Sequence, residues 1–238
     1  MPNVIFRDKL IYSFNRSAFS LQYFDSGDLH GNDNFRTQDV SVPIYEILNQ
    51  IDPDILRSAL AATINNKPVP LTEKITEDCT LDIITIDAPD GKMIYYRSLA
   101  FFLAQTVFLL DPSTRLTVFD TANDHCTLQF DISDNAALSD DAIREQLEQL
   151  LSDKTAIQVI SAWQKEMLLQ TYPSLLQPYT QQVLKDYDDY DFVPVAVRKN
   201  FVLPVEENAI FVLSPDALRN YHLSVLQTKT SLSITAAI

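Results

Sequence analysis

Short apolar runs separated by polar turns occupy the first part of the chain. Residues 3–16 predict a β-hairpin, and residues 61–64 and 81–86 predict further strands, because β-branched and aromatic side chains suit a pleated sheet. Between them, apolar residues at helical spacing predict a helix over 43–51, with Pro43 as its first residue. Two strands, a helix and further strands, with the last strand central, are the order of a ubiquitin-like β-grasp.

A polar insertion and a turn divide this part of the sequence. Residues 17–41 are dominated by Ser, Asp, Gly and Asn, and we interpret them as an insertion into the β-grasp. Pro89-Asp90-Gly91 predicts a turn, because these residue types favour tight reversals of the chain. We place a domain boundary at this turn, which gives domains 1–91 and 92–238.

The second part mixes helical and strand patterns, which predicts an α+β fold. Residues 97–110 are apolar on nearly all sides and predict a buried helix. The tail after Thr228 is poor in aromatic residues and is expected to fray. The other predicted elements are strands at 115–120 and 127–132, a helix that starts after Ser139, a strand at 156–160, a broken helical stretch at 164–185, strands at 192–197, 201–205 and 209–213, and a short helix from Ser214.

The apolar stretches, the N-terminal residues and the cysteine content indicate where in the cell the protein is located. The longest apolar stretch, Leu99 to Leu110, is interrupted by Gln105 and Thr106 and falls short of the ~20 residues of a membrane span. The N-terminal residues lack the basic and apolar regions of a secretory signal. Two cysteines give no disulfide framework. We expect a soluble cytoplasmic protein that does not contact a membrane.

Charge and glycine content exclude several classes of function. The net charge of −14 argues against nucleic acid as a general partner, because phosphates are bound by lysine and arginine. The chain has three glycines, and Gly27 and Gly31 do not have the spacing of a Walker A loop. Three closely spaced glycines for a dinucleotide site are also missing. We therefore expect no nucleotide cofactor.

The residues that could ligate a metal are scattered. Cys79, Cys126 and the three histidines show no zinc spacing, and His125 and Cys126 are adjacent. The acidic run 186–191 is typical of a solvated linker. We predict no metal site, no other cofactor and no catalytic residue.

The order of segments from residue 60 onward resembles a known pair of domains. "LAATINNKPVPLTEKITEDCTLDIITIDAPDG" is similar to the second half of a TGS domain, the β-grasp module that opens threonyl-tRNA synthetases. "KMIYYRSLAFFLAQTVFLLDP" resembles the helix that begins their editing domain, and "RLTVFDTANDHCTLQFDIS" and "LSDDAIREQLEQLLSDK" continue in the same order. The resemblance covers residues 1–165 and, more loosely, the rest.

This chain differs from the threonyl-tRNA synthetases at the positions of their editing-site residues. In the synthetases the helix carries a His-x-x-x-His pair, and a cysteine further on completes the site. The matching positions here are Arg97 and Phe101, and Val197 lies near the expected cysteine. A guanidinium neither loses its proton nor binds a metal. The resemblance therefore implies the framework of an editing domain without its chemistry.

A second family resembles this chain and also looks to have the histidines replaced. "YYRSLAFFLA" resembles the N-terminal region of bacterial nucleoside (uridine) kinases, in which the same pair of domains precedes a P-loop kinase domain. "FVLPVEENAIFVLSPDALRNYHL" is similar to the end of that region. The kinase domain is absent from this chain, as the glycine content indicates.

These observations give two hypotheses for function. The first is a catalytically silent accessory or regulatory module that binds a small ligand or a protein partner. The alternative is the N-terminal regulatory region of an ATP-dependent nucleoside kinase. Arg97, Ser98 and Phe101 form the candidate ligand site. Arg97 either pairs with a carboxylate such as Asp131 or awaits an anionic ligand.

Overall fold

The fold is that of a computed structural model, which describes residues 3–6, 9–13, 42–51, 53–76, 79–121, 124–133, 138–171, 178–188, 191–206 and 208–238. The predicted insertion at 17–41 lies outside these residues. The chain forms two compact units, Met1–Ala88 and Pro89–Ile238. Both combine helices with sheets, so the fold class is α+β, as predicted.

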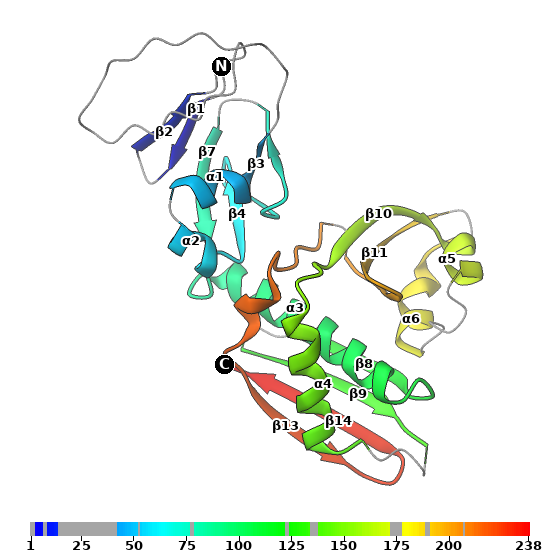
Figure 1. The fold of residues 1–238 in the computed structure, drawn as a ribbon. Helices are drawn as coiled ribbons and strands as arrows, with labels where there is room; N and C mark the ends of the chain where they lie inside the picture. The colour runs from blue at the N-terminus through cyan, green and yellow to red at the C-terminus, as the bar shows by residue number, and fades with distance from the viewer. Residues whose placement is uncertain are drawn as a thin grey trace. The chain divides into compact units, whose positions relative to one another are not determined.

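The first unit is built on a five-stranded mixed sheet with the order β2-β1-β7-β4-β5 (Figure 1). The two N-terminal strands pair antiparallel, and β1 runs parallel to β7, the last strand of the unit and the centre of the sheet. This is the β-grasp arrangement that the sequence predicts. The strands are β1 (Asn3–Phe6), β2 (Lys9–Ser13), β4 (Ala61–Ile64), β5 (Lys67–Val69) and β7 (Cys79–Ile84).

Helix α1 (Ile44–Ile51) supplies the apolar stripe of this unit. Ile44, Ile47 and Leu48 are fully buried, as their helical spacing predicts. The prediction that Pro43 begins the helix is wrong, because Pro43 belongs to a short strand, β3 (Val42–Pro43), which pairs with β6 (Lys74–Ile75). A short helix, α2 (Pro53–Ser58), follows α1.

The second unit is organised around one long helix, α3 (Pro89–Leu110). The predicted turn at Pro89-Asp90-Gly91 is wrong: these residues form the first turn of α3, where proline is well tolerated because its missing N–H has no helical partner there. By length and composition α3 is apolar enough to cross a membrane, which the sequence analysis does not anticipate. However, 72% of its apolar window is buried inside the protein.

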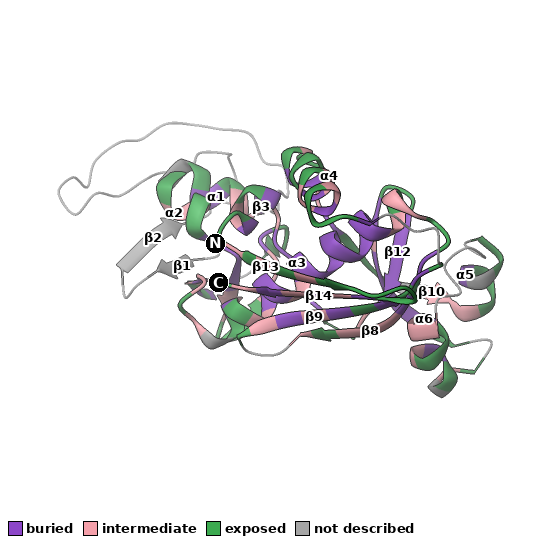
Figure 2. Ribbon diagram, turned by 90° about the horizontal axis from the view of Figure 1, so that it is seen from below, coloured by how far each residue is buried: buried purple, intermediate pink, exposed green. Residues whose placement is uncertain are grey.

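A four-stranded antiparallel sheet packs against α3, with the order β13-β14-β9-β8. Helix α4 (Asp140–Ser152) packs against α3 on the side away from this sheet (Figure 2). Its predicted start is confirmed, because the Ser139 Oγ accepts a hydrogen bond from the Ala142 N–H at 3.2 Å. The strands are β8 (Arg115–Thr121), β9 (His125–Asp131), β13 (His222–Gln227) and β14 (Ser231–Ala237).

The expectation that the tail frays is wrong. Strand β14 lies inside the sheet, between β13 and β9. Leu232, Ile234 and Ala236 alternate along it and are fully buried, so the two-residue period, rather than aromatic content, marks the strand.

A second sheet of three antiparallel strands completes the unit, with the order β10-β11-β12. A strand predicted at 209–213 is wrong: Val212 donates its N–H to the Ser98 Oγ instead of to a neighbouring strand. The remaining elements are β10 (Gln158–Gln164), α5 (Lys165–Thr171), α6 (Pro178–Val183), η2 (Leu184–Asp186), β11 (Phe192–Arg198), β12 (Phe201–Pro204) and η3 (Pro215–Leu218).

Candidate functional site

Arg97 lies on α3 and is already paired with a carboxylate. Its Nη2 is 3.0 Å from Glu206 Oε2, so the partner is Glu206 and not Asp131. The Arg97 side chain is 12% exposed and that of Glu206 is 82% exposed. An ion pair with one partner in solvent contributes little to stability, about 1 kcal/mol or less. Glu206 can therefore turn away from Arg97 at small cost.

Tyr179, from α6, lies close to this ion pair. Burial raises the pKa of the Tyr179 hydroxyl, Glu206 adds to the rise and Arg97 opposes it. The Tyr179 ring is 5.5 Å from that of Phe119 on β8. Arg97 therefore belongs to a half-buried contact between α3, α6 and the segment after β12.

Ser98 and Phe101 lie below the surface. The fully buried Ser98 Oγ donates to the Ile94 carbonyl at 2.7 Å and accepts from the Val212 N–H at 3.0 Å. Phe101 is also fully buried, with its ring 5.1 Å from Phe201 and 5.8 Å from Phe211. Of the three predicted site residues, Arg97 alone reaches solvent. Their role in ligand binding stays a prediction.

A buried cation that the sequence analysis did not single out lies further along α3. Arg198, the last residue of β11, is 1% exposed, and its carbon Cζ lies 4.8 Å from the centre of the Phe102 ring. The guanidinium donates to the side-chain oxygen of Gln105 at 3.0 Å. Its other hydrogen bonds go to the carbonyl oxygens of Leu150, Asp153 and Thr155. Desolvation lowers the pKa of Arg198, and Asp153 opposes that shift.

Asp153, just after α4, contacts both the buried Arg198 and the exposed Lys199. One carboxylate oxygen is 3.5 Å from Arg198 Nη2 and pairs with Lys199 Nζ. The other accepts from the N–H and the hydroxyl of Thr155, at 3.0 and 2.7 Å. Lys199 first, and then Thr155, hold the pKa of Asp153 well below its usual range. Asp153 is therefore a carboxylate at neutral pH.

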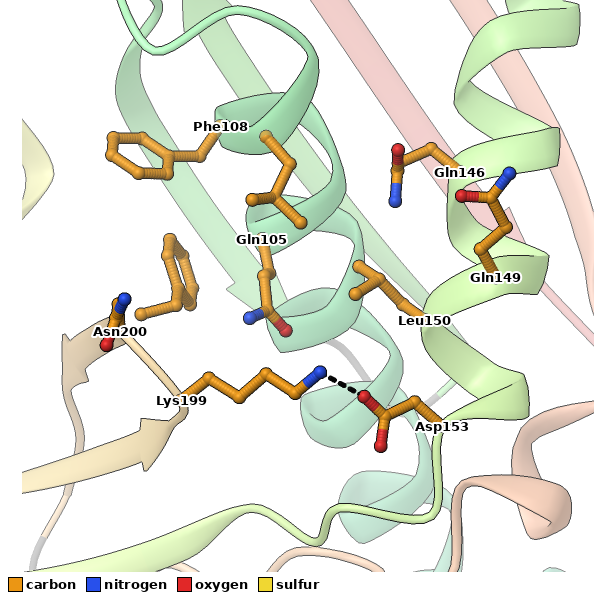
Figure 3. A pocket seen from close by; sticks show the side chains of 10 residues that line it. Gln105, Phe108, Gln146, Gln149, Leu150, Asp153, Lys199 and Asn200 are labelled. Carbon is orange, nitrogen blue, oxygen red and sulfur yellow. Dashed lines mark ion pairs between the residues drawn. The ribbon is translucent and has the colours of Figure 1, made fainter.

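A pocket of about 380 Å³ is lined by residues that include Gln105, Leu150 and Asp153, which also contact Arg198 (Figure 3). It lies between the last turns of α3, the last turns of α4 and the turn from β11 to β12, where Lys199 adopts a left-handed conformation with φ 54°. Its volume is in the range of small-molecule sites. The lining residues are Gln105, Phe108, Leu109, Gln146, Gln149, Leu150, Asp153, Lys199, Asn200 and Phe201.

Of the residues considered as metal ligands, Cys79, Cys126, His125 and His222 lie in the described part of the chain, and His30 lies outside it. Within the part of the chain that the structure describes, no three His, Cys, Asp or Glu side chains are grouped to hold a metal. Cys79 and Cys126 are both buried, and burial raises the pKa of the Cys126 thiol to about 12. A thiol that stays protonated is a poor nucleophile.

A β-grasp unit followed by an α+β unit around one buried helix is the class of protein that the structure defines. No family model matches the chain. Curated relatives that match it are threonine–tRNA ligases. The ligase of Ehrlichia canis is 22% identical over 191 residues, or 80% of this chain and 28% of the ligase. The ligase of Caldanaerobacter subterraneus is 25% identical over 164 residues, or 68% of this chain and 25% of the ligase.

The chain spans about a quarter of the length of the ligases that it matches. It is thus similar to one region of a threonyl-tRNA synthetase, in agreement with the resemblance in the sequence. At these identities the framework is related, and the activity of the whole ligase does not follow.

Proposed function

We propose that this chain is a catalytically silent accessory module, related to a region of threonyl-tRNA synthetases, that binds a small ligand or a protein partner in the cytoplasm. One observation carries the proposal. Phe101, at a position where the resemblance implies a catalytic histidine, is fully buried in an aromatic cluster, and the neighbouring Arg97 is paired with Glu206. Groups that take up and release protons are thus replaced by a packed ring and a permanent cation.

The identity of the first unit is part of the same proposal. We propose that it is a TGS domain. The strand order, with β7 in the centre and parallel to β1, supports this assignment, as does its place ahead of a synthetase-like region.

One observation supports the alternative that the chain is the regulatory region of a nucleoside kinase. The sequence Arg97-Ser98-Leu99 in α3 resembles the corresponding helix of that family. Translation of the gene beyond Ile238 separates the two proposals. A P-loop in the same frame would favour the regulatory region of a kinase, whereas a stop codon would favour the stand-alone module.

The experiment that tests the proposed function is a set of turnover assays. The purified chain should hydrolyse neither ATP nor mischarged tRNA, and it should not phosphorylate nucleosides. A full-length bacterial threonine–tRNA ligase, assayed in parallel, is the positive control for hydrolysis of mischarged tRNA. Turnover that remains constant per mole of protein through successive purification steps would overturn the proposal.

A further inference from the structure

We propose that the pocket between α3, α4 and the β11–β12 turn binds a small ligand that carries one carboxylate on a flat apolar body. The inference rests on the proposed function and deepens it, because it gives the accessory module a binding site and a ligand class. The site is separate from the predicted one, since Arg97, Ser98 and Phe101 do not line the pocket.

The apolar part of the pocket lining suits an apolar ring. Phe108 and Leu109 come from α3, Leu150 from α4 and Phe201 from the start of β12. Leu109 is 50% exposed, so a large apolar side chain faces solvent at the mouth of a concave surface. Covering it with a ring removes apolar surface from water, which is the main source of affinity in such sites.

The charges at one end of the pocket favour a single negative charge. Lys199 and Asp153 line this end, and the Nη2 of the buried Arg198 lies 3.5 Å from the Asp153 carboxylate. Two cations and one carboxylate leave an excess of one positive charge. Glu148, on the same helix as Gln146 and Gln149, is turned away to accept a hydrogen bond from the Tyr221 hydroxyl at 2.8 Å.

The net charge of the chain limits the charge of the ligand. At −14, the protein as a whole repels polyanions, so a compound with several phosphates is disfavoured. A monocarboxylate matches the local excess without that repulsion.

Hydrogen-bond donors for a carboxylate are present at the rim. Gln146, Gln149 and Asn200 line the pocket, and among the described residues none of their carboxamides has a partner within the protein. Gln105 is not available, because its amide is engaged by the side chain and carbonyl of Arg198. The Lys199 ammonium has three N–H groups, so it can hold Asp153 and a ligand carboxylate together.

Three probes of the same shape separate the contributions of charge and ring. They are 1-naphthoate, 1-naphthamide and 1-naphthylmethylamine, titrated into the full chain and followed by ligand-observed NMR. We expect saturable binding of 1-naphthoate with a dissociation constant of about 1 mM or below, the range for a ligand of this size. The amide should bind at least fivefold more weakly, and the amine should not bind measurably.

Four variants test whether 1-naphthoate binds in this pocket. Lys199→Met should weaken 1-naphthoate binding about tenfold, and Leu109→Asp should abolish it. Lys154→Met is the matched control, because Lys154 is exposed, close in sequence and not part of the lining, and it should change affinity less than twofold. Arg97→Ala should also leave the affinity unchanged.

Several results would overturn this inference. One is that 1-naphthoate shows no saturable binding at a ligand concentration tenfold above the expected dissociation constant. Another is that 1-naphthoate and 1-naphthamide bind with equal affinity. A further one is that Lys199→Met and Lys154→Met change the affinity equally. If Arg97→Ala abolishes binding and Lys199→Met does not, the pocket assignment is wrong while the accessory function stands. Turnover of mischarged tRNA would instead contradict the proposed function and leave the binding result intact.

Discussion

At the scale of single residues, Arg198 holds together segments that are far apart in the sequence. It joins β11 to Gln105 of α3 and to three carbonyl groups around the end of α4. The carbonyls of Asp153 and Thr155 lie just beyond α4, and that of Leu150, in its last turn, also accepts from the Asp153 N–H at 3.2 Å. The buried guanidinium therefore adds hydrogen bonds around the end of the helix, where backbone donors are scarce. Arg198 thereby ties together Gln105, Leu150 and Asp153, which line the pocket.

Replacement of Arg198 should destabilise the second unit strongly. Arg198→Met removes the donors of several buried acceptors, and we expect the free energy of unfolding to fall by about 3 kcal/mol or more. Lys199→Met is the control, because its ion pair is half-exposed, and it should cost less than about 1 kcal/mol. Urea unfolding followed by the fluorescence of Trp163, the single tryptophan, reports on this unit. Equal losses for the two variants would contradict this account of Arg198.

The stability that Asp153 contributes should depend on pH. Its pKa is depressed in the folded state, so the unfolded chain binds the proton more tightly. The contribution is therefore present above the unfolded pKa of about 4 and is lost as the pH falls below it. The difference in free energy of unfolding between the wild type and Asp153→Asn should be constant from about pH 7 to 5 and shrink towards pH 3. A difference that grows on acidification would contradict the ion-pair assignment.

At the scale of elements, local periodicity predicts most helices and strands but not how far they extend. The stripe of α1, the N-cap of α4 and the central position of β7 follow from residue types and their order. The start of α3 does not, because Pro89 and Gly91 favour a turn locally and the helix forms around them. Strand β14 is missed because the prediction relied on aromatic content, whereas the alternation of Leu232, Ile234 and Ala236 marks a strand that lies between β9 and β13.

Neighbouring residues of β14 should differ sharply in their effect on stability. Ile234 is fully buried beneath α3, and Ile234→Ala should lower the free energy of unfolding of the second unit by about 3 kcal/mol. Thr235 faces the other side of the sheet, and Thr235→Ala should cost less than about 1 kcal/mol. Both are measured by urea unfolding with Trp163 as the probe. A fraying tail would make both substitutions nearly neutral.

At the scale of the whole molecule, the class and order of the fold follow from the sequence, whereas the pocket does not. The β-grasp and the α+β region can be recognised from apolar runs that are contiguous in the chain. The pocket is assembled from residues 105–109, 146–153 and 199–201, which tertiary packing brings together. The sequence instead points to Arg97, because its place on the helix resembles a catalytic position of the synthetases. The signal in the sequence that could have indicated Arg198 is an arginine that directly follows the apolar strand predicted at 192–197.

Hydrolysis of mischarged tRNA under single-turnover conditions tests the central claim most directly. With the protein in excess over the aminoacyl-tRNA, even a slow catalytic step becomes visible as a rate above that of the protein-free reaction. We predict equal rates with and without the chain, because the helix positions that would carry proton transfer hold a paired guanidinium and a buried ring. Faster hydrolysis that copurifies with the chain and is lost in Arg97→Ala would contradict the account.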